Sequence, residues 1–249
     1  MNPVSLNPVA SCLRGCFVTG TDTDAGKTCV STALLHWCSA QGWRSAGFKP
    51  VSAGCQSLDG QRVNGDVRAL RNASSLALSD AEVGPFQFDV ACAPHVAAAL
   101  EQRTIDGPAL LAHALALARR ADVLVVEGVG GFCVPLSAQW DTADLAQALA
   151  LPVILVVGLR LGCINHALLT AEAIQNRGLP LAGWVANTVD PAMMQAQATL
   201  ATLQHELMRR YRAPCLGLIP RLAVPEAAQV AAHFDSTALA ALLGPHHTV

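Results

Sequence analysis

The residues best suited to chemistry lie near the N-terminus, where the apolar stretch 16–19 is followed by the segment 20–28, GTDTDAGKT. Counted from Thr21, four free positions precede the Gly-Lys-Thr at 26–28, which is the second half of a phosphate-binding P-loop. In such a loop the backbone N–H groups surround phosphate oxygens, the lysine reaches the outer phosphates and the hydroxyl binds Mg²⁺. The helix expected after the loop adds its positive N-terminal end to the same site. Thr21 stands where the pattern usually has its first glycine, which indicates a variant P-loop.

Lysine is rare in this chain: Lys27 and Lys49 are the two lysines among 16 basic residues, and the others are arginines. A compact ammonium differs from a planar guanidinium in hydration, reach and donor geometry, so both lysines are candidates for chemistry that arginine cannot perform. Lys49 precedes Pro50, which favours an extended backbone and directs the side chain out of the strand end. A second ammonium near the phosphates would stabilise a negative intermediate or a transferring phosphoryl group. The alternative is that a lysine stands at these positions by chance, which applies more readily to Lys49 than to Lys27.

Two acidic residues are candidate metal ligands. Glu127 follows the apolar stretch 123–126, as the acidic residue of a Walker B strand does, and Asp66 follows Gly65 in a polar segment. Together with the Thr28 hydroxyl and phosphate oxygens, two carboxylates are enough for Mg²⁺, which keeps several water ligands. Other roles stay open, because Glu127 could cap its strand or act through a bound water, and Asp66 could be the N-cap of a helix.

Apolar stretches typical of buried strands alternate with helical patterns over the whole chain, which predicts an α/β fold with a doubly wound, mostly parallel sheet, as in P-loop NTPases. The expected strands are 16–19, 44–49, 83–88, 122–127, 153–157, 181–187 and 215–219. The expected helices are 26–40, 66–72, 95–102, 108–120, 141–150, 164–176, 192–210 and 236–243. Residues 15–244 would form a single domain between loose tails at 1–14 and 245–249, and the polar segment 51–65 is expected to be a mobile surface loop.

Ligands of such a sheet bind beyond the carboxyl ends of its strands. Polar groups stand at those ends repeatedly, so the P-loop, Lys49, Glu127, Asn187 and the turn 220–222 are predicted to converge on one edge of the sheet. The segment 161–165, LGCIN, opens a helix with free backbone N–H groups. These groups suit a carboxylate from a substrate or from a partner subunit, and a plain turn is the equal alternative.

The composition excludes several classes of function. Hydrophobic residues make up 52% of the chain and charged residues 14%, which excludes a disordered chain. The longest apolar stretch, 149–159, contains Pro152 and Gly158 and is too short to span a bilayer. A net charge of −2 predicts neither nucleic acid nor a membrane as a partner. Nine cysteines without a CxxC pair, and an N-terminus without a signal-peptide pattern, predict a cytoplasmic protein with reduced thiols and no zinc site.

Five stretches together resemble the dethiobiotin synthetase family, the ATP-dependent cyclo-ligases of biotin biosynthesis. They are FVTGTDT with GKT within 17–28, AGFKPV at 46–51, VVEGVGG at 125–131, GCINHA at 162–167 and AGWVAN at 182–187. The stretches follow the family's order and span most of residues 16–226. The GTDT form of the loop is typical of the family, which accounts for the displaced glycine.

The resemblance implies that 7,8-diaminononanoate, CO₂ and ATP, with Mg²⁺, give dethiobiotin, ADP and phosphate. A substrate amine would first form a carbamate, whose oxygen would take the γ-phosphoryl group to give a carbamic–phosphoric anhydride. The neighbouring amine would then close the ureido ring. The resemblance also implies a homodimer with the substrate near the subunit interface.

The resemblance also gives roles to the matching residues. Lys27, Lys49 and Thr23 would be catalytic, with Lys27 stabilising the transferring phosphoryl group and Lys49 holding the carbamate. The nucleotide and its Mg²⁺ would contact Asp24, Ala25, Gly26, Lys27, Thr28, Cys29, Asp66, Glu127, Gly128, Val129, Gly130, Asn187, Thr188, Pro220, Arg221, Leu222 and Glu226, with the metal on Thr28, Asp66 and Glu127. The substrate would contact Ser52 or Ala53 and, from the partner subunit, the helix start made of Gly162, Cys163, Ile164 and Asn165.

The chain departs from the family's pattern in two places. The family commonly has a substrate-contacting serine four residues after the second lysine, where this chain has Ala53 preceded by Ser52. That contact is then lost, moved to Ser52 or made by the backbone. The segment between Leu222 and Glu226 is also shortened, which makes the match at Glu226 less specific.

Two other classes of protein share these motifs. A ParA/MinD-like ATPase switch carries a second lysine early in its P-loop, and Thr21 and Asp22 occupy that region here. The synthetase half of a cobyrinate-type amidotransferase shares the fold but normally has an attached glutaminase domain, for which 249 residues leave no room. We therefore expect the cyclo-ligase, and a ureido product distinguishes it from both alternatives.

Overall fold

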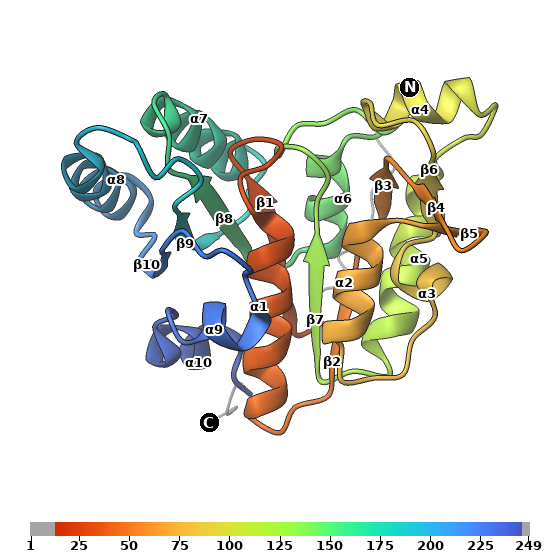
Figure 1. Ribbon diagram of the computed structural model, residues 1–249, viewed down its shortest axis with the longest axis horizontal. Coiled ribbons are helices and arrows are strands. Elements are labelled where there is room, and N and C mark those ends of the chain that lie inside the picture. The colour runs from red at the N-terminus through yellow and green to blue at the C-terminus, as the bar shows by residue number, and fades with distance from the viewer. Residues whose placement is uncertain (1–12, 246–249) are drawn as a thin grey trace.

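A six-stranded parallel sheet forms the centre of the protein, whose computed structural model describes residues 13–245 (Figure 1). In spatial order the strands are β10 (Cys215–Ile219), β9 (Leu181–Asn187), β8 (Val153–Gly158), β1 (Gly15–Gly20), β7 (Val123–Glu127) and β2 (Ser45–Phe48). Most of the two expected tails, residues 1–12 and 246–249, lies outside the described residues. At the described N-terminal end, Leu13 packs against the core and the Arg14 guanidinium lies 4.0 Å from the centre of the Trp43 ring.

The central strands are buried on both faces, which is why they stand in the sequence as continuous apolar stretches. Successive side chains of a strand point to opposite faces of a sheet. In β7, Leu124 and Val126 accordingly join one hydrophobic core, while Val123 and Val125 join the other. The sheet therefore separates two cores, each of which needs its own layer of helices.

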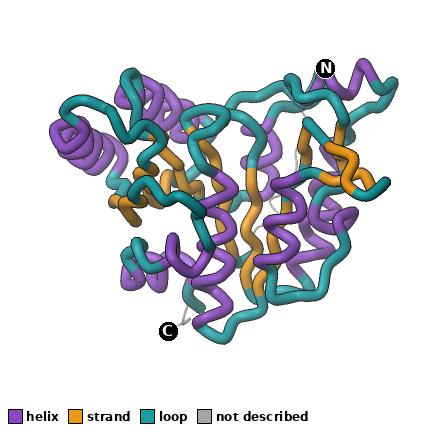
Figure 2. The backbone as a smooth tube through the Cα atoms, viewed as in Figure 1, coloured by secondary structure: helices purple, strands orange, loops and turns teal. Residues whose placement is uncertain are grey.

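Helices supply these two layers (Figure 2). One core contains side chains of α1 (Lys27–Ala40), α2 (Gly65–Ala73), α9 (Ala227–Ala231) and α10 (Ser236–Leu243). The other contains side chains of α5 (Gly107–Ala118), α6 (Thr142–Leu149), α7 (Cys163–Asn176) and α8 (Ala196–Tyr211). The doubly wound parallel sheet expected from the sequence is thus confirmed. Within residues 13–245, no helix is both long enough and apolar enough to cross a bilayer.

The direction in which the chain adds strands reverses at β1. After β1 the chain forms β2, and β7 is later inserted between these two strands. The chain then continues on the other side of β1 with β8, β9 and β10 in turn. Ligand-binding crevices form where the strand order reverses in this way, beyond the carboxyl ends of the strands. The P-loop connects β1 to α1 and therefore opens on this crevice.

The segment 51–65 is not the irregular loop that we expected. It contains three short strands, β3 (Val51–Ala53), β4 (Gln56–Leu58) and β5 (Gln61–Val63). β4 and β5 form an antiparallel hairpin, and β3 pairs in parallel with β6 (Phe86–Phe88). Asp59 and Gly60 turn the hairpin with φ angles of 51° and 74°, the two left-handed positions that a type I′ turn requires. The Asp-Gly dipeptide was the hairpin signal in the sequence.

Several other elements also differ from the expected ones. The expected strand 83–88 is divided, because Val83 ends the short helix α3 (Asp80–Val83) and the strand is only β6. Ser79 and Glu82 form a capping box at the start of α3, a signal that was present in the sequence. The helices α4 (Pro94–Leu100) and α9 are short, and α9, which begins after Glu226, was not expected at all.

We expect Trp184→Ala to lower the free energy of unfolding by about 3–5 kcal/mol, because Trp184 on β9 is fully buried and its truncation leaves a cavity. Leu218→Ala on the neighbouring strand β10 is the control, since Leu218 is 43% exposed and its loss should change stability by less than about 1 kcal/mol. Urea unfolding followed by circular dichroism measures both variants. Similar losses in the two variants would contradict the buried position of Trp184.

Candidate functional site

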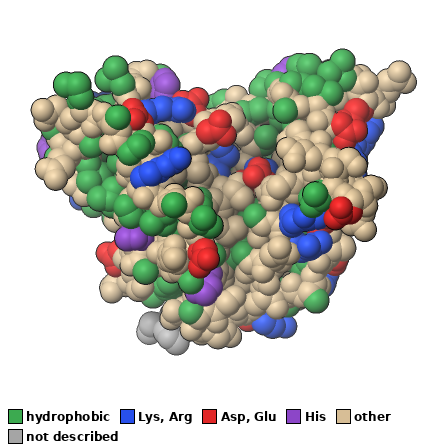
Figure 3. Space-filling view, in the orientation of Figure 1, with side chains coloured by type: hydrophobic (Ala, Val, Ile, Leu, Met, Phe, Trp, Pro, Cys, Tyr) green, Lys and Arg blue, Asp and Glu red, His purple; other side chains and the backbone are tan. Residues whose placement is uncertain are grey.

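An open cleft of about 1120 Å³ lies beyond the carboxyl ends of the central strands. The space-filling view shows the surface hollowed between the flank that carries α7 and the flank that carries α4 (Figure 3). The P-loop forms the floor of this cleft, and the ends of β8 and β9 and the segment before α4 contribute to its walls. The predicted convergence of strand-end residues is therefore found at this edge of the sheet.

The P-loop contains backbone positions in the left-handed region, which most residue types rarely adopt. Asp24 and Gly26 are both left-handed, with φ angles of 61° and 99°. Asn187 donates from Nδ2 to the carbonyl oxygen of Ala25 at 2.9 Å. A Cβ atom on Gly26 would lie 2.1 Å from this Nδ2, so the position requires glycine both for its φ angle and for space.

Helix α1 begins directly after Gly26, and no side chain caps its N-terminus. The first N–H groups of a helix have no partner within the helix, and together with the helix dipole they attract an anion. The floor of the cleft is therefore suited to a phosphate group.

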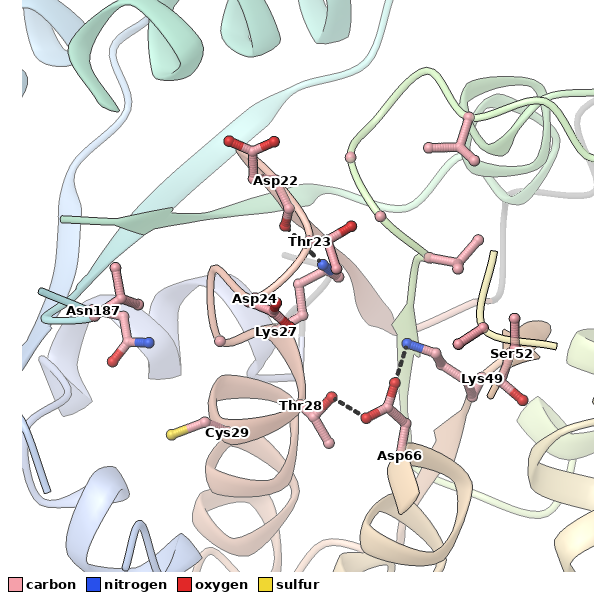
Figure 4. A pocket seen from close by; sticks show the side chains of 18 of the residues that line it. Asp22, Thr23, Asp24, Lys27, Thr28, Cys29, Lys49, Ser52, Asp66 and Asn187 are labelled. Atoms are coloured by element: carbon pink, nitrogen blue, oxygen red, sulfur yellow. Dashed lines mark hydrogen bonds and ion pairs between the residues drawn. The ribbon is translucent and has the colours of Figure 1, made fainter. Parts of the chain in front are cut away.

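Lys27, the first residue of α1, is 7% exposed. Its Nζ donates to the carbonyl oxygen of Asp22 at 3.0 Å (Figure 4). Burial, assisted by the positive charge of Lys49, lowers the pKa of Lys27 to about 8, although nearby carboxylates act in the opposite direction. An ammonium with so few protein partners and so little water is strongly stabilised by an anion bound beside it.

Lys49 lies between two carboxylates where β2 ends. The register of the sheet pairs Phe48 with Val126, so the next residues, Lys49 and Glu127, lie side by side. Lys49 Nζ lies 2.6 Å from Glu127 Oε1 and 2.9 Å from Asp66 Oδ2. Both Lys49 and Glu127 are buried.

Lys49 and Asp66 shift each other's pKa. Burial alone would lower the pKa of Lys49, but the carboxylates of Glu127 and Asp66 outweigh it and hold that pKa above its ordinary value. Burial would raise the pKa of Asp66, but the Lys49 ammonium outweighs it and holds that pKa below its ordinary value. Lys49 therefore remains a cation and Asp66 an anion.

Asp66 is not the cap of its helix. Asn64 caps α2, and its side chain accepts from the backbone N–H groups of Asp66 and Val67 at 3.1 and 3.3 Å. The Asp66 carboxylate is therefore available to face Lys49 and the P-loop. The role of helix N-cap, which the sequence left open for Asp66, is excluded.

The hydroxyl of Thr28 lies between the same two carboxylates, 2.9 Å from Asp66 Oδ1 and 2.8 Å from Glu127 Oε1. One hydroxyl has one proton, so it donates to a single carboxylate at a time. The second carboxylate oxygen of Glu127, Oε2, is buried and has no hydrogen-bond partner among residues 13–245. A buried carboxylate oxygen without a partner is unfavourable, so this group is suited to a further cation.

The set of oxygens formed by Thr28, Asp66 and Glu127 fits Mg²⁺, which prefers oxygen ligands and binds few carboxylates. In the described part of the chain, no group of three or more His, Cys, Asp and Glu side chains forms a metal site by itself. A magnesium ion here would thus depend on phosphate oxygens and water for its remaining ligands.

Ser52, on β3, has a hydroxyl without a hydrogen-bond partner in the described chain, and the residue is 1% exposed. It lines the cleft near Lys49 and Asp66 (Figure 4). Ala53 beside it also lines the cleft but has no polar side-chain group. An unused hydroxyl in this wall is therefore available to a ligand.

Most residues that the sequence singled out line the cleft, and their roles remain predictions. The lining includes Thr23, Asp24, Gly26, Lys27, Thr28, Cys29, Lys49, Ser52, Ala53, Asp66, Val129, Gly130, Asn187 and Arg221. It does not include Ala25, Glu127, Gly128, Gly162, Cys163, Ile164, Asn165, Thr188, Pro220, Leu222 and Glu226. Two of these, Glu127 and Gly128, lie behind the lining and hold Lys49 in place, because the Gly128 carbonyl also accepts from Lys49 Nζ at 3.1 Å.

Other residues line the cleft although the sequence did not single them out as ligands. They are Asp22, Ala91, Cys92, Ala93, Pro94, Gly131, Val134, Arg160, Val189 and Asp190. Arg160 follows β8, and residues that follow the carboxyl end of a strand are candidates for ligand binding. Pro94, in the first turn of α4, marks the start of a helix. We find no local signal for Val134, which reaches the cleft through the connection after β7.

The P-loop and the reversal of strand order define the chain as a P-loop α/β protein, and comparisons with known proteins agree. Residues 14–229 match the family model AAA_26, described as an AAA domain. The ATP-dependent dethiobiotin synthetase BioD of Aromatoleum aromaticum is 51% identical over 219 residues, covering 88% of this chain and 96% of that protein. The chain belongs to the dethiobiotin synthetase family.

Solved structures share the fold at much lower identity. The MinC:MinD cell division protein complex of Aquifex aeolicus matches with a TM-score of 0.55 and 13% identity, covering 95% of this chain and 98% of that one. The cell division ATPase MinD of Pyrococcus furiosus matches with a TM-score of 0.53 and 15% identity, covering 92% and 98%. At these identities the likeness shows the fold alone.

We expect Gly26→Ala to weaken the binding of a non-hydrolysable ATP analogue with Mg²⁺ at least tenfold, because the added Cβ displaces Asn187 and strains the loop. Gly42→Ala is a matched control, since Gly42 also has a positive φ angle, 77°, but its Cβ would meet no atom within 4 Å. Isothermal titration calorimetry measures both affinities. Binding that falls equally in the two variants would contradict the role given to the Gly26–Asn187 contact.

Proposed function

We propose that this protein is an ATP-dependent cyclo-ligase that forms dethiobiotin from 7,8-diaminononanoate and CO₂. The observation that carries the proposal is the placement of the two lysines of the chain beside one cleft. Lys27 lies at the start of the P-loop helix, and Lys49 lies between the carboxylates of Glu127 and Asp66. The identity of 51% with a dethiobiotin synthetase supports the choice of substrate.

The P-loop end of the cleft would bind the phosphates of ATP. The open N–H groups of α1 and the Lys27 ammonium supply positive charge there, and Lys27, which gives one of its three donor hydrogens to the Asp22 carbonyl, would bind a phosphate oxygen with another. The adenine nucleoside would lie toward Asn187 and Arg221, which line the cleft on the side of β9 and β10. Thr188, Pro220, Leu222 and Glu226 would complete this end, in keeping with the resemblance.

Mg²⁺ would be held by Thr28, Asp66 and Glu127, and when bound it would neutralise charge on the phosphates of ATP. Lys49 already balances part of the charge of the same carboxylates. The protein side chains thus keep this group of charges together before any ligand arrives.

The chemistry would follow in three steps with all atoms accounted for. A substrate amine adds to CO₂ and loses a proton, giving a carbamate whose negative oxygen would be held by Lys49. That oxygen attacks the γ-phosphorus and ADP leaves, while Lys27 stabilises the transferring phosphoryl group and Thr23 lies beside it. The second amine then attacks the carbamoyl carbon, loses a proton and expels phosphate, which closes the ureido ring.

The free hydroxyl of Ser52 would contact the substrate in place of the serine that the family has one position later. The carboxylate end of the substrate would bind the start of α7 from a partner subunit in a homodimer. Gly162 stands at the N-cap of this helix, where no side chain forms a capping hydrogen bond, and the start of α7 is not part of its own chain's cleft. Leu161, next to it, is 94% exposed, which suits a position at a subunit interface.

We place the reaction in the cytoplasm, where ATP is available and thiols stay reduced. The described cysteines support this placement, because the eight of them within residues 13–245 are free thiols.

The purified protein should consume ATP only when diaminononanoate and bicarbonate are both present, and each ADP formed should be matched by one ureido product. Coupled measurement of ADP with mass spectrometry of the product checks this expectation. ATP hydrolysis that is independent of the substrate and gives no ureido product would contradict the ligase function and favour an ATPase switch.

Lys49→Arg should lower kcat at least about a hundredfold while the affinity for a Mg²⁺–ATP analogue changes little, because a guanidinium keeps the charge but not the compact shape of the ammonium. Lys49→Met is unsuitable, since it leaves the buried Glu127 uncompensated and destabilises the protein by about 3–5 kcal/mol. Steady-state kinetics and calorimetry give the two quantities.

Arg44→Lys is the matched control for this exchange of residue types. Arg44 pairs with Asp122 on the surface at 2.8 Å, outside the cleft, so its replacement should leave kcat unchanged. A Lys49→Arg variant with normal turnover would refute the role given to Lys49.

A further inference from the structure

The carboxylate of Asp22 connects the P-loop to the first turns of α7. Asp22 Oδ2 lies 3.1 Å from Arg160 Nη2 and 3.0 Å from His166 Nδ1. Arg160 precedes α7, and His166 is the fourth residue of that helix. We call these three residues the Asp22 bracket. Arg160 Nη2 also donates to the carbonyl oxygen of Thr23 at 3.4 Å, so the bracket holds two consecutive residues of the loop.

The other end of Asp22 faces the phosphate site. Its carbonyl oxygen accepts the hydrogen bond from Lys27 Nζ, while its carboxylate points away from Lys27 (Figure 4). Any movement of Asp22 therefore changes the position of the phosphate-binding lysine. Asp22 thus contacts both Lys27 of the P-loop and His166 of α7.

The bracket is weak enough to respond to ligands. Its side chains are 40–46% exposed, and polar contacts at such exposure are weakened by water and salt. The loop beyond it contains the left-handed residues Asp24 and Gly26, and its second half is held by Asn187 through the Ala25 carbonyl. Thr21 is held by a backbone bond to the Val156 carbonyl at 3.0 Å, whereas the bracket holds Asp22 and Thr23. A ligand that orders either end of the bracket therefore lowers the cost of ordering the other end.

We propose that the Asp22 bracket couples nucleotide binding at the P-loop to substrate binding at the start of α7. The inference rests on the proposed function, in which the segment Gly162–Asn165 binds the substrate carboxylate of the other subunit. The ATP site of one subunit is then coupled to the substrate site of its partner. Each ligand tightens the binding of the other about fivefold, and the two effects are equal because coupling is reciprocal. Asp22, Arg160 and His166 are positioning residues in this scheme.

The test measures the ratio of two dissociation constants for the full-length protein. Calorimetry gives the affinity for AMP-PNP with Mg²⁺ in the absence and presence of saturating diaminononanoate, in buffer free of bicarbonate. The wild-type ratio should be about five, and Asp22→Asn, which keeps the shape of the side chain but removes its charge, should bring the ratio to about one. The reverse titration, with diaminononanoate as the titrant, should give the same two ratios.

Two further variants separate coupling from a general effect on stability. Arg160→Lys keeps a positive charge near Asp22, but the compact ammonium differs from the guanidinium in reach and donor geometry. Its ratio should therefore lie between those of Asp22→Asn and wild type. Arg177→Met is the matched control, because Arg177 caps the other end of α7 and pairs with Asp141 at 2.7 Å. It should keep the wild-type ratio.

The outcomes distinguish this proposal from the function on which it rests. Diaminononanoate that binds with a wild-type ratio near one overturns the coupling alone. The coupling is likewise overturned if Asp22→Asn weakens both ligands but keeps their ratio, or if Arg177→Met abolishes the ratio as Asp22→Asn does. Absence of any diaminononanoate binding, with or without AMP-PNP, overturns the proposed function and the coupling with it.

Discussion

A lysine ammonium buried between two carboxylates is the interaction on which the rest of the structure depends. Taking a charge out of water is costly unless partners of opposite charge compensate it, and Glu127 and Asp66 do so for Lys49. Lys49 and Glu127 are 78 positions apart, and the parallel pairing of β2 with β7 brings them to the same level. Because the Thr28 hydroxyl contacts the same two carboxylates, this one group of charges joins the P-loop helix, two strands and α2.

The phosphate loop is ordered by contacts made from outside it rather than by its own sequence alone. Asn187 at the end of β9 holds the Ala25 carbonyl, and Arg160 after β8 donates to the Thr23 carbonyl. Both residues come from the strands that the chain adds after the reversal at β1. The same fold in MinD shows that the scaffold is shared among proteins with different activities. The chemistry of this chain therefore resides in the particular side chains at its strand ends.

The sequence predicted the sheet well because strands buried on both faces, such as β7 and β8, appear as unbroken apolar stretches. It also predicted that Lys49, Glu127 and Asn187 would meet at one edge, since parallel strands end on the same side. The hairpin turned by Asp59 and Gly60 and the capping box of α3 were missed although their signals were local. The contact of Asp22 with His166 could not be predicted, because it joins segments whose proximity only the folded chain creates. The role proposed for the start of α7 requires a second subunit and therefore stays a prediction.

The scarcity of lysine has a consequence for the surface of the molecule. Lys27 and Lys49 are the two lysines of the chain, and both are buried, so the exposed basic side chains are arginines. Guanidinium groups stay protonated and are poor nucleophiles, whereas amines react readily with electrophiles. Apart from the α-amino group, the surface therefore offers almost no amine to amine-directed cross-linkers. Both lysines line the cleft, so covalent labelling of a lysine would report on this one site, and protection by a ligand would be read directly as its occupancy.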